Sequence, residues 1–231
     1  MEAQALAARV AQVRERIEGA CRRAGRTDEV TLVAVTKTHP PEVVRAAIAA
    51  GLTDVGENRV QELEDKVAAV GREAVRWHLI GHLQRNKAAR GLYLSDLFHA
   101  LDSVRLAEAL SRHAAEAGVT CPVLVQVNTS GEESKFGLEP AAALDAIGAM
   151  AELPGLALRG LMTMAPFTDD QAVLRRTFRE ARRLNETAAG QVPGFSGEHL
   201  SMGMSNDYEL AVEEGSTLVR VGSTLFGERG T

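Results

Sequence analysis

Cysteine is scarce in this chain of 231 residues, which contains only Cys21 and Cys121. They form no Cys-x-x-Cys pair and no cysteine–histidine spacing typical of zinc, so neither a disulfide framework nor a zinc site is expected. The pattern indicates a reducing compartment, and we expect a cytoplasmic protein. The N-terminal stretch carries Glu2, Glu15 and Glu18 and lacks the apolar core of a signal peptide.

Excess positive charge and long apolar runs are lacking as well. The 31 Asp and Glu residues outnumber the 26 Lys and Arg residues, which gives a formal net charge of −5 at pH 7. This balance disfavours nucleic acid and anionic membranes as partners, and no run is long enough to cross a bilayer. The basic segment from His82 to Arg90 (HLQRNKAAR) predicts a short helix. It is either a solvated surface or a contact for an anionic partner.

The chain is rich in alternating strand and helix patterns. Apolar, β-branched runs predict strands at 30–35, 53–56, 75–80, 97–101, 122–127, 156–162, 198–202 and 217–221. Helical periodicity occupies 41–50, 58–70, 83–90, 103–117, 140–151, 169–188 and 206–214, after an amphipathic helix at 3–25.

This alternation predicts parallel strands joined by right-handed crossovers, and about eight strands is the number that closes a (β/α)₈ barrel. A doubly wound open sheet is the competing architecture. No G-x-G-x-x-G motif follows the first strand, and the eight units leave no room for a second domain. We therefore predict one TIM-type α/β barrel domain over residues 1–231, with the helix within 1–25 packed on it.

Lys37 lies just beyond the first predicted strand and before Pro40 and Pro41. In a barrel, the C-terminal strand ends carry the chemistry. A lysine there is either a solvated loop charge or a partly desolvated amine that can form a Schiff base with an aldehyde. Of the other lysines, Lys66 is predicted to be a solvated helix charge, and Lys135, after the fifth strand, is the competitor for an aldehyde.

Small hydroxyl residues and glycines follow the seventh and eighth strands, at 201–205 (SMGMS) and 222–224 (GST). Barrels often bind phosphate in these loops, although two glycine turns with helix caps would leave the same pattern. Arg220, within the last strand, is either an ion-paired arginine or a donor to a ring nitrogen of a cofactor. A lysine, a phosphate cradle and an arginine between them would suit pyridoxal 5′-phosphate (PLP).

Seven segments of the chain resemble one family in the same order: VAVTKTHP, GENRVQE, WHLIGHLQRNK, VNTSGEESKFG, GLMTM, SMGMSNDYELA and VRVGSTLFG. The family is that of the PLP homeostasis proteins, which are related to the N-terminal barrel of alanine racemase. One departure is Arg59, where the family often has an aromatic residue. The resemblance implies a set of PLP-binding residues: Lys37, Asn58, Met164, Ser201, Arg220, Gly222 and Ser223.

Within that set, the resemblance implies that Lys37 forms the Schiff base and that Arg220 faces the pyridine nitrogen. The phosphate would be held by Ser201, Gly222 and Ser223. Asn58 and Met164 would line the pocket.

The resemblance also implies a role in PLP (vitamin B6) homeostasis: holding PLP and buffering it or delivering it to apo forms of PLP-dependent enzymes. Racemisation needs an acid/base group on each face of the substrate carbon, and alanine racemases take the second from a tyrosine of another domain. The sequence ends at Thr231, and Tyr93 and Tyr208 fall in helical or connecting segments. We therefore expect a monomer without robust catalysis. The alternative is a weak PLP-dependent amino-acid racemase or lyase.

Overall fold

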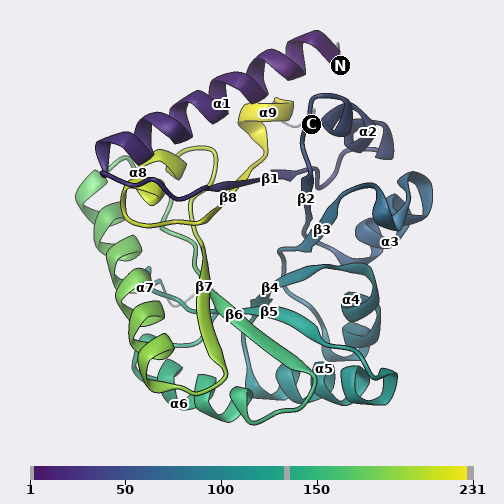
Figure 1. Ribbon diagram of the computed structural model, residues 1–231, viewed down its shortest axis with the longest axis vertical. Coiled ribbons are helices and arrows are strands. Elements are labelled where there is room, and N and C mark those ends of the chain that lie inside the picture. The colour runs from purple at the N-terminus through teal and green to yellow at the C-terminus, as the bar shows by residue number, and fades with distance from the viewer. Residues whose placement is uncertain (1–2, 133–135, 228–231) are drawn as a thin grey trace.

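The computed structural model describes residues 3–132 and 136–227 and contains a closed barrel of parallel strands (Figure 1). Each strand pairs with its neighbours in the sequence, and β8 pairs with β1 to close the ring. The (β/α)₈ prediction is therefore confirmed. The strands are β1 (Thr31–Val35), β2 (Asp54–Glu57), β3 (Arg76–Leu79), β4 (Leu97–Leu101), β5 (Cys121–Gln126), β6 (Leu156–Met162), β7 (Phe195–Ser201) and β8 (Leu218–Val221).

Helices surround the ring of strands and cover its outer face (Figure 1). The barrel strands are covered on both sides, which explains why they read as almost continuous apolar runs. The helices are α1 (Ala3–Arg23), α2 (Pro41–Ala49), α3 (Val60–Val70), α4 (Ala88–Leu94), α5 (Val104–Ala117), α6 (Pro140–Ala151), α7 (Gln171–Gln191), α8 (Tyr208–Glu213) and α9 (Ser223–Phe226), with 3₁₀ turns η1 (Arg72–Ala74) and η2 (Arg85–Lys87).

Local sequence signals fix where several helices begin and end. Proline occupies the first turn of α2 and of α6, where its missing N–H costs nothing. Ser103 accepts a hydrogen bond at the start of α5, and Asp170 does so at the start of α7. Gly118 ends α5 in the left-handed conformation at a φ of 66°. These signals set the loops that carry the strand-end residues.

The opening helix packs on the barrel, as predicted. Its side chains Leu6, Val10, Val13 and Ile17 are buried in an apolar cluster that also contains residues of β1, β8 and α9. Each such side chain contributes about 1.5–3 kcal/mol through burial. α1 therefore covers the side of the barrel where the first and last strands meet (Figure 1).

The helix predicted at 83–90 begins later than expected. Gln84 has an extended backbone, residues 85–87 form η2, and α4 starts at Ala88. Leu83 is buried and lies against Gly91, where an added Cβ would come within 2.7 Å of its Cδ2. Burial of this leucine favours an extended approach to the helix, so the basic segment is not one continuous helix.

Candidate cofactor-binding site

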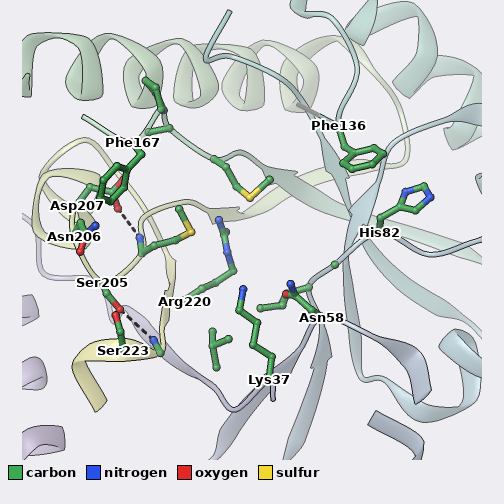
Figure 2. A pocket seen from close by; sticks show the side chains of 18 of the residues that line it. Lys37, Asn58, His82, Phe136, Phe167, Ser205, Asn206, Asp207, Arg220 and Ser223 are labelled. Atoms are coloured by element: carbon green, nitrogen blue, oxygen red, sulfur yellow. Dashed lines mark hydrogen bonds between the residues drawn. The ribbon is translucent and has the colours of Figure 1, made fainter. Parts of the chain in front are cut away.

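A cavity of about 820 Å³ lies at the C-terminal ends of the strands. Lys37 and Arg220 project into it, with Asn58 beside Lys37 (Figure 2). Ser205 and Ser223 lie on one side, and His82 and Phe136 lie on the other. Its volume is in the range of small-molecule sites. Of the seven predicted PLP-binding residues, the six that line the cavity are Lys37, Asn58, Met164, Arg220, Gly222 and Ser223.

The turn that carries Lys37 has an unusual backbone. β1 ends at Val35, and the next residue, Thr36, is fully buried. Thr38 is the one non-glycine residue in the described ranges with a positive φ, at 67°. That region is unfavourable for a β-branched residue, so the surroundings must hold the turn in place.

Arg220 is buried in β8 and fixed by neutral acceptors. Its Nη1 donates to Ser201 Oγ at 2.6 Å, and its Nη2 donates to the carbonyl of Thr163 at 2.9 Å. Burial lowers the pKa of Arg220 to about 10, while the charge of Asp207 opposes that decrease. The guanidinium therefore remains a cation at neutral pH.

A chain of hydrogen bonds fills the barrel interior beneath Arg220. Ser201 Oγ lies 2.9 Å from His99 Nδ1, and His99 Nε2 lies 2.8 Å from His78 Nδ1. His78 Nε2 then lies 2.9 Å from Asp54 Oδ1. The sequence prediction missed this chain, although a signal existed: Asp54, His78 and His99 are polar residues inside predicted apolar strands.

The surroundings of these side chains determine which atom donates and which accepts in each hydrogen bond. Burial lowers the pKa of His99 well below its usual value, helped by the charges of His78 and Arg220. Burial alone would raise the pKa of Asp54, but hydrogen bonds from His78 and Arg76 hold it well below its usual range. A carboxylate only accepts. When both rings are neutral, each ring must therefore carry its proton on Nε2, and Ser201 must donate to His99.

Ser201 therefore does not fit the phosphate role expected of it. Its side chain is fully buried at the end of β7, and its hydroxyl lies between Arg220 and His99. It points into the barrel interior and is not among the residues that line the cavity. Ser205, in the following loop, lines the cavity instead.

The loops after β7 and β8 bring donors together around one oxygen. The N–H groups of Gly222 and Thr224 point at Ser205 Oγ from 3.3 and 3.5 Å. An added Cβ at Gly222 would lie 3.3 Å from the carbonyl oxygen of Val35, so the backbone approaches β1 closely. The loops after β7 and β8 therefore meet at the Ser205 hydroxyl, beside the backbone of Gly222.

The prediction that Lys66 is a solvated charge is wrong. Its side chain is buried on α3, and its Nζ lies 2.6 Å from Oε1 of the buried Glu57. The helix pattern missed this because the partner lies on the preceding strand. Lys135 falls outside the described residues.

The opposite wall of the cavity carries a histidine–aromatic pair. The His82 ring stacks on Phe136 with centroids 4.7 Å apart, and its Nδ1 lies 2.9 Å from Asp102 Oδ2. His82, the first residue of the predicted basic segment, therefore contributes to the cavity. In the described ranges, no group of His, Cys, Asp and Glu side chains could hold a metal ion, and no helix could cross a membrane.

Comparison with known proteins identifies the family. The family model "Alanine racemase, N-terminal domain" matches residues 3–230. A relative from Aquifex aeolicus (strain VF5), named "Pyridoxal phosphate homeostasis protein", is 41% identical over 222 residues, which cover 96% of this chain and 97% of the relative. The chain belongs to the pyridoxal phosphate homeostasis protein family.

Solved structures agree with this assignment. PipY of Synechococcus elongatus PCC7942, solved with PLP bound, is 37% identical at a TM-score of 0.84, covering 96% of this chain and all of PipY (100%). An alanine racemase of Clostridium difficile 630 is 13% identical at a TM-score of 0.77, covering 99% of this chain and 58% of the racemase. The racemase shares the barrel fold, whereas PipY is a full-length relative.

Proposed function

We propose that this protein binds PLP at Lys37 and holds it in a form available to other proteins, as part of PLP homeostasis. One observation carries the proposal: Lys37, Arg220 and the loop residues Ser205, Gly222 and Ser223 all line one cavity. The name of the Aquifex relative and the PLP bound to PipY support the same assignment.

The residues present fit the chemical groups of PLP. The cofactor supplies an aldehyde that condenses with a primary amine, a phosphate, and a pyridine ring that can accept electrons. Lys37 is a primary amine of the cavity, and the loop residues Ser205, Gly222 and Ser223 offer hydroxyl and N–H donors to an anion. Asn58 and Met164 would complete the walls.

Arg220 argues for holding rather than catalysis. A permanent donor beside a pyridine nitrogen keeps that nitrogen unprotonated and weakens the ring as an electron sink. Racemisation also needs a second acid/base group, and no tyrosine is among the described residues that line the cavity. Tyr93 is exposed on α4, and Tyr208 is buried on α8. We therefore assign no robust enzymatic activity to the protein.

A weak racemase or lyase remains the second candidate because His39 and His82 line the same cavity. Incubation with amino acids in deuterated water separates the two functions. We expect no exchange of the α-proton beyond one equivalent per protein. Exchange over many turnovers would support the enzyme and contradict the holding role.

For the biological setting, we propose a cytoplasmic monomer of one domain that passes PLP to apo forms of PLP-dependent enzymes. Both cysteines are free thiols, as a reducing compartment requires, and burial raises the pKa of Cys121 to about 12. Adding an excess of an apo-enzyme to the loaded protein should remove the bound PLP. Retention of PLP under these conditions would contradict delivery.

The site itself is tested with the visible absorption spectrum of wild type, Lys37→Ala and the control Lys87→Ala after addition of PLP. Borohydride reduction and peptide mapping then locate the attached cofactor. We expect a bound-PLP band in wild type and in the control, no such band in Lys37→Ala, and the label on Lys37. A band that persists in Lys37→Ala with label on Lys135 would mean that the lysine is misassigned. No band in wild type would refute the proposal.

A further inference from the structure

Two side chains of α3 hold the peptide groups on both sides of Lys37. Glu62 Oε2 accepts a hydrogen bond from the Thr38 N–H at 2.8 Å. Lys66 Nζ donates to the Thr36 carbonyl at 2.7 Å. Glu62 and Lys66 are four residues apart, so they lie on the same face of the helix. The peptide before Lys37 and the peptide after it are therefore both fixed from one element.

The contact before Lys37, at the Thr36 carbonyl, involves a buried ion pair. Lys66 contacts Glu57 as well as the Thr36 carbonyl, and the Thr36 hydroxyl donates to the same carboxylate oxygen of Glu57. The other oxygen, Oε2, is buried without a hydrogen-bond partner in the described part of the chain. Burial raises the pKa of Glu57, against the effects of Lys66 and Thr36.

Such a pair is a poor source of stability, because desolvation of two charges consumes most of their attraction. Its third partner suggests another role. The amine of Lys66 is shared between a carboxylate and the backbone of the residue just before Lys37. The pair therefore orients an ammonium group toward the end of β1.

The contact after Lys37, made by Glu62, supports the backbone at Thr38. This residue is exposed and has the positive φ described above, which an unsupported loop would relax. The carboxylate of Glu62 binds the N–H of this residue. Release of that contact would let the turn, and Lys37 with it, adopt other conformations.

We propose that Glu62 and Lys66 are positioning residues that hold the backbone on both sides of Lys37 and so direct its amine into the cavity. The inference rests on the proposed PLP-binding role of Lys37. A purely structural role, in which the contacts only attach α3 to the barrel, would leave the chemistry of Lys37 unchanged in a folded variant.

The variants separate the two roles. Lys66→Met combined with Glu57→Gln removes the hold on Thr36 without leaving a buried charge, while Glu62→Ala removes the hold on Thr38 from a partly exposed position. Glu62→Gln keeps an oxygen acceptor and serves as the conservative rescue. Asp65→Asn, an exposed carboxylate of the same helix, is the matched control.

The first readout needs no PLP. The rate of reductive methylation of Lys37 is followed against pH by peptide mass spectrometry, with Lys87 as the internal reference. Because Lys37 and Arg220 face one cavity, movement of the amine changes its exposure and its distance from a cation. We expect the pH profile of Lys37 to shift in Glu62→Ala and in the double variant, and to stay near wild type in Glu62→Gln and Asp65→Asn.

The second readout is the rate of PLP attachment, which should fall on the order of tenfold in the same two variants, since small misplacements of a reacting group are costly. Thermal unfolding identifies which variants are folded, and Glu62→Ala carries the test alone if the double variant is not. An unchanged methylation profile and attachment rate in folded Glu62→Ala would overturn the inference. Failure of wild type to bind PLP would refute the proposed function instead, and the methylation profile would still test the positioning role.

Discussion

The buried pair of Lys66 and Glu57 allows a quantitative prediction for the single substitution Lys66→Met. The change leaves the Glu57 carboxylate, which is fully buried, without its cationic partner. Removal of one member of a buried pair costs about 3–5 kcal/mol at neutral pH. For a chain of this size, that corresponds to a decrease in melting temperature of about 6–20 °C.

The same variant should show a distinctive pH dependence. Burial already raises the folded-state pKa of Glu57, and loss of Lys66 removes an effect that lowers it. A group whose pKa is raised on folding contributes its full stability below its unfolded pKa, about 4.3, and loses it as the pH rises toward the folded value. The difference in unfolding free energy between wild type and Lys66→Met should therefore be small near pH 4 and grow toward pH 7.

Urea denaturation at several pH values measures this difference, with Lys66→Met/Glu57→Gln as the companion variant. The double variant should recover most of the lost stability at pH 7, because no charge is left buried. An equal loss at pH 4 and pH 7 would show that Lys66 stabilises the fold by packing alone. A double variant as unstable as the single one would show that the unpaired carboxylate is not the cause.

Three further substitutions test other parts of the site. Arg220→Met removes the donors to the buried Ser201 hydroxyl and to the Thr163 carbonyl. It should destabilise the fold by about 1–3 kcal/mol. It should also weaken PLP binding in a fluorescence titration. Gly222→Ala places a Cβ against the Val35 carbonyl and should weaken binding of PLP and of competing inorganic phosphate. The control Gly148→Ala, whose added Cβ would meet no atom within 4 Å, should leave both affinities unchanged. Asp54→Asn should destabilise the protein at pH 7, and the loss should shrink as the pH falls below about 4, because a carboxylate with a lowered folded pKa contributes its full stability above its unfolded pKa and loses it as the pH falls toward the folded value. Urea denaturation at pH 7 and below pH 4 checks this.

The strands, their order and the two central cavity residues could be predicted because they depend on local patterns. Runs of β-branched residues end at Lys37, and Arg220 interrupts the last of them. The hydrogen-bond chain inside the barrel depends instead on the register between strands. β2 pairs with β3 so that Gly56 lies opposite His78, and this register brings Asp54 of β2 within hydrogen-bonding distance of His78. No single strand carries that information.

Two errors have related causes. Ser201 and Ser205 belong to the same SMGMS segment, but side chains alternate along a strand, and Ser201 still belongs to β7. Its hydroxyl therefore faces the interior. Lys66 lies on a helix among acidic residues, a pattern typical of a surface, and only the tertiary position of Glu57 shows that it is buried.

The hydrogen-bond chain beneath Arg220 runs through the barrel interior from one end of the strands to the other. At the far end, Arg76 is an exposed side chain that donates to both oxygens of Asp54, next to a separate cavity of about 430 Å³. Each hydrogen bond in this series has one donor and one acceptor. A proton added to either histidine must therefore reverse the donor and acceptor roles of the neighbouring groups in turn. A substitution at Arg76, on the surface and remote from the cofactor cavity, would therefore remove donors from Asp54, which three hydrogen bonds connect to the Ser201 hydroxyl beneath Arg220.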